Sequence, residues 1–355
     1  MIRIAILGCG RVVVNRYVEV FLKEVSGVKV TVVCDPVHEK ADTVARLLNC
    51  TAVYDEASLY NSSNVDVVLV CTESGKHFDH IRKALMAGKH VITEKPPTLL
   101  PDQVVDLETM AKDKGLMFAV IFQNRLNPAM VKLKEAFDLG RFGKLVLATI
   151  RLRWCRYQDY YEDGWHGTWA MDGGVVNQQA IHHIDALQWV CGNVAEVCAD
   201  TGNMLNRLEA EDTMMALVRF ESGAMGAIEA TTAARPEDFE ASMSVVGEKG
   251  MALIGGIALN KILTWNFVEP RAEDAETPVR HSMEVPTGYG LSHGPLVQEI
   301  VNRLARGKTV PPITGFDSLP TVKLVHALYA SAEQRGWVRL RDDPLSNRLG
   351  KSRGD

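Results

Sequence analysis

Two side chains in predicted elements have the chemistry of a charge-stabilising cation and of a general base. Lys95 lies in the tripeptide Glu-Lys-Pro at 94–96, directly after the apolar run 90–93, which we predict to be a parallel strand. An ammonium group at the carboxyl end of such a strand can stabilise negative charge that develops on an oxygen atom. His182 lies in a predicted helix over 174–191, and a neutral imidazole is a suitable general base near neutral pH. A surface lysine and a buried core histidine are the structural alternatives.

A glycine pair near the N-terminus indicates nucleotide binding. Gly8 and Gly10 follow the predicted strand 2–7 and open the next helix, where glycine lets the backbone approach a pyrophosphate. We expect these glycines, with Arg11 and Val12 after them, to contact the cofactor. An ordinary strand–helix turn is the alternative, because a valine replaces the third small residue of the motif.

Asp35 indicates which nicotinamide cofactor the chain would bind. It ends the second predicted strand, over 28–34, where a carboxylate can accept hydrogen bonds from ribose hydroxyls. The same carboxylate would repel a 2′-phosphate, and no arginine follows it directly. The sequence therefore predicts NAD rather than NADP.

The first 122 residues alternate short apolar runs with amphipathic segments. Strands are predicted at 2–7, 28–34, 65–71, 90–93 and 117–122, and helices at 12–24, 38–48, 78–87 and 102–114. Apolar strands between amphipathic helices are typical of a parallel sheet covered on both faces. We therefore predict a doubly wound, Rossmann-type α/β domain over 1–122.

Longer strands predominate after residue 122. They are predicted at 145–154, 194–200, 213–220, 224–232 and 241–246, with helices at 174–191, 296–306 and 319–333 and a polar loop at 270–290. The tight connection at 221–223 predicts an antiparallel hairpin. We expect a second domain over 123–340 and a frayed, charged tail over 341–355.

Composition limits the class of protein. The 355 residues are 46% hydrophobic and 23% charged, which predicts a folded chain of two domains. A net charge of −5 gives no basic surface for nucleic acid, and no apolar run approaches the roughly 20 residues that span a bilayer. The 7 cysteines are irregularly spaced, which favours a reducing cytoplasm, and we predict no metal site.

Four segments together resemble the glucose–fructose oxidoreductase / inositol dehydrogenase (Gfo/Idh/MocA) family. They are Glu-Lys-Pro at 94–96, Cys-Thr-Glu-Ser-Gly-Lys-His at 71–77, Gly-Gly at 173–174 and Ile-His-His-Ile-Asp at 181–185. The resemblance covers nearly the whole chain. It implies a second α/β domain with a large, mostly antiparallel open sheet, and homodimers or homotetramers built through that sheet.

The resemblance also implies roles for single residues. Thr72, His77, Glu94, Lys95 and Gln123 are implied cofactor contacts, and Lys95 would also contact the reacting hydroxyl. The family's usual aspartate one turn before His182 is Gln178 here, which can still hydrogen-bond a hydroxyl. Asp185 would be either a substrate contact or an orienting partner.

The segment 151–174 is rich in arginine and aromatic residues. It is similar to the branch of the family that oxidises sugar-nucleotide uronates, the UDP-N-acetylglucosaminuronate 3-dehydrogenases. The candidate substrate contacts in it are Arg153, Arg156, Tyr161, Trp165 and His166, the last in place of an arginine often found there. Arginines could bind carboxylate or phosphate oxygens and rings could line a sugar face, but an exposed strand with alternating polar residues is an equal alternative.

These observations predict an NAD-dependent oxidoreductase acting on a secondary alcohol of a sugar or sugar nucleotide. Lys95 would polarise the hydroxyl, and His182 would accept its proton directly or through Gln178 or water. A polyol or inositol dehydrogenase, an NAD-dependent glycosidase and a cofactor-bound sensor are the alternatives. A sensor need not keep a base, so intact Lys95 and His182 argue against it.

Overall fold

The computed structural model describes residues 1–352 and divides into two compact units. The first comprises residues 1–123 and 291–319, and the second comprises 124–290 and the chain from 320 onward. The first boundary falls one residue after the predicted one. Residues 291–319, expected in the second domain, belong instead to the first unit.

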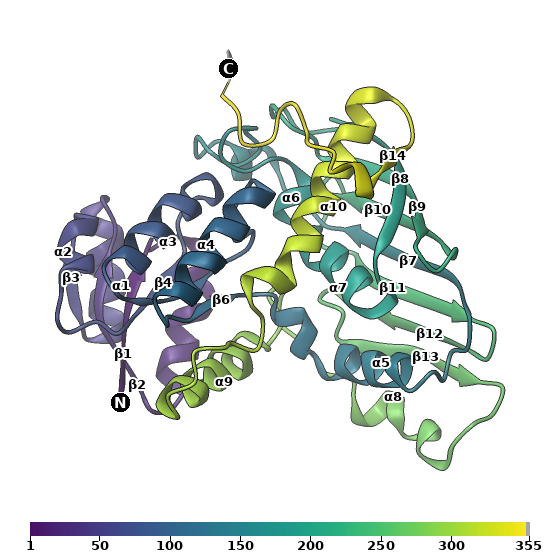
Figure 1. The fold of residues 1–355 in the computed structure, drawn as a ribbon, viewed down its shortest axis with the longest axis horizontal. Helices are drawn as coiled ribbons and strands as arrows, with labels where there is room; N and C mark the ends of the chain where they lie inside the picture. The colour runs from purple at the N-terminus through teal and green to yellow at the C-terminus, as the bar shows by residue number, and fades with distance from the viewer. Residues whose placement is uncertain (353–355) are drawn as a thin grey trace. The chain divides into compact units, whose positions relative to one another are not determined.

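The first unit is built on a six-stranded parallel sheet of order β3-β2-β1-β4-β5-β6 (Figure 1). Its strands are β1 (Ile2–Leu7), β2 (Val28–Cys34), β3 (Thr51–Val53), β4 (Val67–Val70), β5 (His90–Thr93) and β6 (Phe118–Val120). Leu7 is in register with Cys34 and Val70, and Val70 is in register with Thr93. The strands therefore end level with one another, which places the loops that follow them at one edge of the sheet.

Helices of the first unit flank this sheet, and the longer ones bury an apolar stripe. They are η1 (Val13–Tyr17), η2 (Val20–Glu24), α1 (His38–Leu48), α2 (Glu56–Tyr60), η3 (Ser74–Lys76), α3 (His77–Met86), α4 (Pro101–Asp113) and α9 (His293–Ala305). In α4, Pro101 occupies the first turn and Val104, Leu107 and Ala111 are buried at helical spacing. The predicted helix 12–24 is formed, but η1 and η2 within it are π-helical.

Helix α9 explains why 291–319 returns to the first unit. It packs against η2 and β1, and Gln298 accepts a hydrogen bond of 2.7 Å from the backbone nitrogen of Ser26. An amphipathic stripe predicts that a helix is half-buried, but it does not say which sheet will bury it.

The second unit contains an eight-stranded sheet of order β13-β12-β11-β7-β10-β9-β8-β14, antiparallel except for the parallel pair β7 and β10. Its strands are β7 (Leu145–Arg153), β8 (Val194–Gly202), β9 (Thr213–Phe220), β10 (Met225–Thr231), β11 (Glu240–Gly247), β12 (Gly250–Gly255), β13 (Lys261–Phe267) and β14 (Val338–Arg339). The hairpin at 221–223 joins β9 to β10 as predicted. The two sheets confirm the predicted α/β class.

One face of this sheet is covered by helices (Figure 1). The helices of the second unit are α5 (Pro128–Asp138), α6 (Val175–Gln178), α7 (Ile181–Cys191) and α8 (Thr277–Arg280), and α10 (Gly315–Gln334) continues into it from the first unit. Helix α7 packs on β7 and β11, while α6 packs on β9 and β10. On the opposite face Met215 and Leu217 of β9 are 54% and 52% exposed.

The predicted single helix 174–191 is wrong at its centre, because residues 179–180 separate α6 from α7. The backbone nitrogen of Ala180 bonds to the carbonyl of Val175, five residues back, at 2.7 Å. The polar segment 270–290 is also more ordered than predicted, since it contains η6 (Ala272–Ala275) and α8. Asp274 anchors it by accepting hydrogen bonds of 2.7 and 2.6 Å from Arg141.

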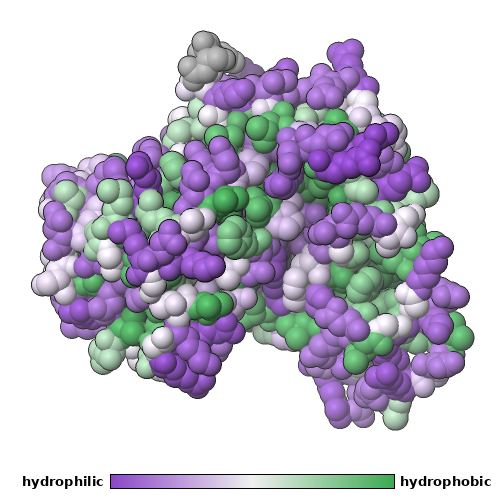
Figure 2. Space-filling view, viewed as in Figure 1, coloured by the Kyte–Doolittle hydropathy of each residue, from purple (hydrophilic) through white to green (hydrophobic). Residues whose placement is uncertain are grey.

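The C-terminal tail packs rather than frays over the residues that the structure describes. Leu349 is 0% exposed, and the backbone nitrogen of Ser346 donates to Nδ1 of His326 at 3.1 Å. Positions 353–355 lie outside the described residues. Polar and apolar residues are interspersed on the face drawn in Figure 2. Within 1–352 no helix is long and apolar enough to cross a membrane, and no group of three or more His, Cys, Asp and Glu residues is arranged to hold a metal.

Candidate active site

The turn after β1 has the shape of a phosphate-binding loop. Gly8 has φ +91°, and a Cβ atom there would lie 2.7 Å from the carbonyl oxygen of Cys71, so only glycine fits. A Cβ atom on Gly10 would meet no described atom within 4 Å. Gly8 is therefore needed for packing, whereas Gly10 leaves open space in front of the helix that begins at Arg11 and Val12.

Asp35 is fixed beside this turn. Its Oδ2 accepts a hydrogen bond of 2.9 Å from the backbone nitrogen of Cys9, and its Oδ1 accepts one of 2.9 Å from Val37. The residue is only 8% exposed. Each carboxylate oxygen can accept a second hydrogen bond, so Asp35 can still receive the two ribose hydroxyls of a dinucleotide.

The residue before Lys95 is held by a buried polar cluster. Oε1 of Glu94 accepts a hydrogen bond of 2.7 Å from the hydroxyl of Tyr17 and lies 3.7 Å from Nε2 of His293. Oε2 of Glu94 accepts from the backbone nitrogen of Lys95 at 3.2 Å. Burial raises the pKa of Glu94, against the opposing effects of the Lys95 charge and the Tyr17 hydrogen bond. Glu94 thus fixes the backbone from which Lys95 projects.

His77 ties two strand-end loops together. Its Nδ1 lies 2.7 Å from the carbonyl oxygen of Pro96, and its Nε2 lies 3.0 Å from that of Thr72. The residue is 1% exposed, and burial lowers its pKa to about 4 against the opposing effect of the two carbonyl groups. A neutral imidazole has one N–H group, so at neutral pH the ring donates to one of the two carbonyls at a time. We expected a direct cofactor contact, but both ring nitrogens face the protein, so His77 supports the loops that carry Thr72 and Lys95.

Two further cofactor candidates lie at the same sheet edge. The hydroxyl of Thr72 is 2.9 Å from Nδ1 of His80. Gln123 is 3% exposed, and its Oε1 has no hydrogen-bond partner among residues 1–352. Their contact with a nicotinamide cofactor stays a prediction.

The second unit carries the predicted base. His182 lies in the first turn of α7 and is 8% exposed. Gln178 ends α6, and its Nε2 donates a hydrogen bond of 2.6 Å to Oδ1 of Asp172. His183 packs edge-on against Trp154 at 5.9 Å between ring centroids, and burial lowers its pKa to about 4, as expected of a structural residue.

Asp185 forms a buried ion pair with Arg125. Its carboxylate accepts hydrogen bonds of 2.8 and 2.6 Å from the guanidinium of Arg125 and one of 3.0 Å from Thr321. The residue is 1% exposed. Burial and three donors occupy most of this carboxylate, which agrees better with the predicted role of an orienting partner than with a substrate contact, and both roles stay predictions.

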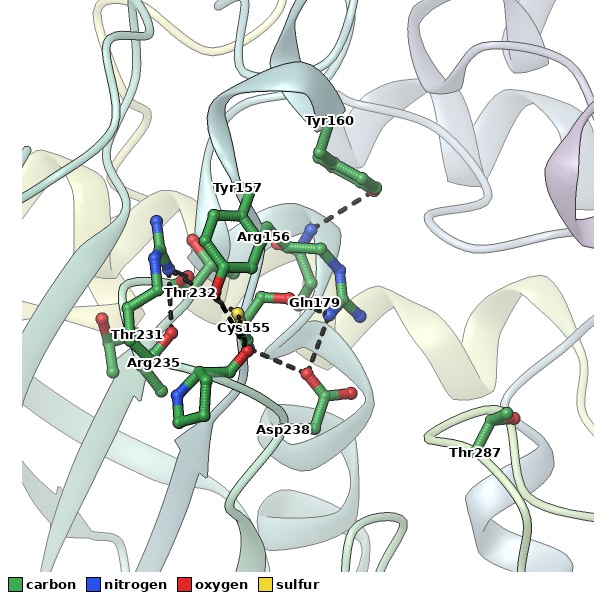
Figure 3. A network of polar contacts seen from close by, with 12 residues as sticks. Cys155, Arg156, Tyr157, Tyr160, Gln179, Thr231, Thr232, Arg235, Asp238 and Thr287 are labelled. Atoms are coloured by element: carbon green, nitrogen blue, oxygen red, sulfur yellow. Dashed lines mark hydrogen bonds and ion pairs between the residues drawn. The ribbon is translucent and has the colours of Figure 1, made fainter.

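Arg156 presents one side of its guanidinium away from its protein partners (Figure 3). Nη1 donates to Oδ1 of Asp238 at 2.9 Å and to the carbonyl of Cys155 at 2.6 Å. The guanidinium carbon lies 5.2 Å from the ring centroid of Trp154 and 5.6 Å from that of Tyr160. In the described chain, its Nε and Nη2 have no hydrogen-bond acceptor. The contact of Arg156 with an anionic substrate stays a prediction.

Arg153 is engaged differently. It donates to both oxygens of Glu229, and its Nη1 donates to Glu240 at 3.1 Å, all within the large sheet. An incoming anion would have to compete with two carboxylates. Of the two predicted arginines, Arg156 is therefore the better anion contact.

A surface cavity of about 680 Å³ adjoins the aromatic segment. Its lining residues are Tyr161, His166, Gly167, Thr168 and residues 203–209. Nδ1 of His166 lies 2.6 Å from Asp163, and the hydroxyl of Tyr161 lies 2.7 Å from that of Thr232. The ring of Trp165 lies tilted against that of His166 at 3.7 Å between centroids, but Trp165 does not line the cavity. Tyr161 and His166 both line this cavity, and their contact with a substrate stays a prediction.

Four residues with roles at these sites were not predicted. They are Tyr17, Asp172, Asp238 and His293. Asp172 directly precedes the Gly-Gly pair at 173–174, and this position is a signal that could have been used. The others act through partners distant in the chain and have no local signal.

Comparisons with known proteins agree with both units. Residues 2–122 match an oxidoreductase family with an NAD-binding Rossmann fold, and residues 130–253 match the GFO/IDH/MocA C-terminal domain. The WlbA dehydrogenase from Bordetella pertussis, solved with NADH and UDP-GlcNAcA, has 30% identity and a TM-score of 0.88 over 95% of this chain and 97% of that one. The scyllo-inositol 2-dehydrogenase (NAD(+)) of Bacillus subtilis (strain 168) is 27% identical over 72% of this chain and 74% of its own length. The myo-inositol 2-dehydrogenase of Thermotoga maritima is 24% identical over 96% and 99%, respectively.

Proposed function

Because the chain belongs to the Gfo/Idh/MocA family of NAD-dependent oxidoreductases acting on CH–OH groups, we propose that it oxidises a sugar-nucleotide secondary alcohol. The specific candidate is C3 of a UDP-linked N-acetyl uronate. The similarity to WlbA, crystallised with UDP-GlcNAcA, supports this substrate class.

The residues around the first turn fit NAD. The open space at Gly10 would receive the pyrophosphate, and Asp35 would accept hydrogen bonds from the ribose. When bound, the nicotinamide supplies the acceptor for a hydride. Glu94, Tyr17 and His77 act indirectly, because they hold the backbone that carries Lys95.

Lys95 and His182 would share the proton chemistry at one hydroxyl. The Lys95 ammonium would donate a hydrogen bond to the alcohol oxygen and stabilise negative charge as it develops there. His182 would accept the hydroxyl proton, directly or through Gln178 or a water molecule.

The observation that carries the proposed substrate is the open side of Arg156. Asp238 holds one nitrogen of the guanidinium, while Nε and Nη2 remain available for an anionic group with two neighbouring oxygens. Nucleotide diphosphates and uronate carboxylates both present such oxygens, whereas free polyols carry no charge. This favours a charged substrate over inositol.

The test compares Arg156→Ala with Arg153→Ala as a matched control on the same segment. Losing hydrogen bonds to a charged group costs roughly 1.5–3 kcal/mol, so Arg156→Ala should raise KM for a UDP-linked uronate about ten-fold or more. Arg153→Ala should change it little, and Arg156→Ala should barely affect turnover of free inositol. Equal effects of Arg156→Ala on both substrates, or efficient oxidation of inositol by the unmodified enzyme, would favour the polyol alternative.

The polyol alternative has its own support. The two inositol dehydrogenases above match large parts of this chain. Steady-state kinetics on scyllo- and myo-inositol beside the UDP-sugar decide between the two. A glycosidase would differ from both, since it would release a sugar with no net NADH.

The uncovered face of the large sheet suggests self-association. Leu147 is paired with Met225 and Val246, and Val246 is also paired with Met251, so these exposed apolar side chains adjoin across four strands. Monomeric proteins rarely expose large continuous apolar patches. We propose a homodimer or homotetramer formed through this face. Leu147→Glu should lower the mass measured by light scattering, and an unmodified protein that is monomeric at micromolar concentration would exclude the assembly.

A further inference from the structure

Asp172 is a buried carboxylate fixed between the substrate segment and α6. It is 1% exposed, and its Oδ2 accepts a hydrogen bond of 3.0 Å from the backbone nitrogen of Gly167. Its Oδ1 accepts the 2.6 Å bond from Nε2 of Gln178. Its backbone is held as well, since its carbonyl accepts from Nδ2 of Asn177 at 2.6 Å and its nitrogen donates to Thr168 at 3.0 Å. The position of the carboxylate is therefore determined from both sides.

Only one orientation of the Gln178 amide fits this arrangement. An ionised carboxylate accepts hydrogen bonds and cannot donate, whereas an amide has a donor nitrogen on one side and an acceptor oxygen on the other. Two N–H groups point at the carboxylate oxygens of Asp172. The charge of Asp172 is also among the causes that raise the pKa of Tyr160, after burial.

We infer that Asp172 is a positioning residue that turns the Gln178 amide so that Oε1 faces away from Asp172 as a hydrogen-bond acceptor. This rests on the proposed function, in which a substrate hydroxyl needs an acceptor near His182. An aspartate at position 178 would present an acceptor oxygen together with its charge. Here Gln178 supplies the acceptor oxygen, and the negative charge is on Asp172, which is hydrogen-bonded to the other end of the same amide.

The main test is Asp172→Asn. The asparagine oxygen can still accept from Gly167, but its NH2 group would then face Gln178 and could be satisfied only if that amide flipped. The flipped amide presents a donor instead of an acceptor. We expect kcat to fall about ten-fold or more, with little change in KM for NAD and a melting temperature within a few degrees of the unmodified protein.

Rescue distinguishes positioning from a general structural role. In Asp172→Asn with Gln178→Glu, the asparagine donates to one glutamate oxygen and the other oxygen is again an acceptor, so kcat should recover several-fold relative to Asp172→Asn. Gln178→Glu alone would place two carboxylates in contact and should be less active than the double variant. Gln179→Glu, the neighbouring amide, is the matched control and should not rescue Asp172→Asn. A double variant no more active than Asp172→Asn would overturn the inference.

A readout that needs no substrate separates this inference from the proposed function. The NMR signal of the Gln178 side-chain amide can be assigned by its loss in Gln178→Glu. In the holoenzyme its protons should exchange slowly with solvent. In Asp172→Asn the signal should shift and the exchange should be faster. An unchanged signal in Asp172→Asn would overturn the inference. If the signal behaves as expected but no alcohol is oxidised, the proposed function fails and the role of Asp172 stands.

Discussion

The hydroxyl of Tyr17 donates a hydrogen bond of 2.7 Å to Glu94, the residue directly before Lys95. Tyr17 is 0% and Glu94 is 7% exposed, so water cannot readily replace this bond. Residues 77 positions apart in the chain thus hold the segment that carries the predicted catalytic lysine.

Tyr17→Phe should therefore lower both stability and turnover. A buried acceptor left without its donor costs about 1–3 kcal/mol of unfolding free energy, measured by urea denaturation. Tyr54→Phe is the matched control, because Tyr54 makes a 2.9 Å bond to Asp42 but is 40% exposed. If Tyr17→Phe and Tyr54→Phe lowered the unfolding free energy equally, burial of the Tyr17–Glu94 bond would add nothing to stability.

The glycines of the first turn should separate folding from cofactor binding. Gly10→Ala meets no described atom within 4 Å, so the protein should fold normally while its affinity for NAD falls about ten-fold or more. Gly8→Ala would place a methyl group 2.7 Å from the carbonyl of Cys71 and should lower the melting temperature strongly. Calorimetric titration of NAD into folded Gly10→Ala is the measurement, and unchanged affinity would remove Gly10 from the cofactor site.

Substitutions at Lys95 and His182 should affect turnover in different ways. Lys95→Met removes the ammonium and should lower kcat about 100-fold or more, with a smaller change in KM. His182→Gln should lower kcat and flatten the acid limb of its pH profile, because a glutamine does not titrate.

His183→Gln is the control for His182. His183 packs against Trp154, so this substitution should lower stability and leave the shape of the pH profile unchanged. Near-normal turnover in Lys95→Met or His182→Gln would exclude that residue from the mechanism.

Glu211 should make stability depend on pH. Burial raises its pKa to about 8, while Tyr329 and the backbone nitrogen of Val176 donate to its Oε1 at 2.9 and 3.0 Å. The unfolded chain releases this proton near pH 4.3, so the stabilising effect of the neutral acid is complete below that pH. As the pH rises from there to about 8, this stabilising effect should be lost, and the free energy of unfolding should fall by up to about 1.4 kcal/mol per pH unit.

Glu211→Gln keeps the acceptor oxygen and stays neutral at every pH. The difference in unfolding free energy between Glu211→Gln and the unmodified protein should therefore move in favour of the variant between pH 5 and 8. Glu209→Gln, an exposed carboxylate two residues away, serves as the control. A difference that does not vary with pH would mean that Glu211 is ionised throughout this range.

Local patterns in the sequence were sufficient for most strands of the first unit's sheet and for the edge at which they end. Apolar runs identified five of its six strands, and glycines or polar residues marked where β1, β2 and β5 end. These features depend on a few neighbouring residues, because burial on both faces demands continuous apolar character. The position of Lys95 at a strand end followed from the same pattern.

Other features depend on packing between distant segments and had no local signal. Strands β12 and β13 were not predicted, and neither was the break at residues 179–180 in the helix predicted over 174–191. Glu211, from a distant loop, accepts a hydrogen bond from the backbone nitrogen of Val176 at the start of α6. The pairing of Asp185 with Arg125 also required the fold, since an isolated aspartate looks the same whether it faces solvent or a guanidinium.

The sequence by itself therefore determined the family, the cofactor class and the residue types available for chemistry. The tertiary structure decided which polar groups are hydrogen-bonded within the protein and which remain available to a ligand. Arg153 and Arg156 look equivalent in the sequence, but only Arg156 keeps guanidinium nitrogens without a partner in the described chain. Hydrogen-bond partners are set by distances of about 3 Å between chain segments far apart in sequence, and only the packed fold determines those distances.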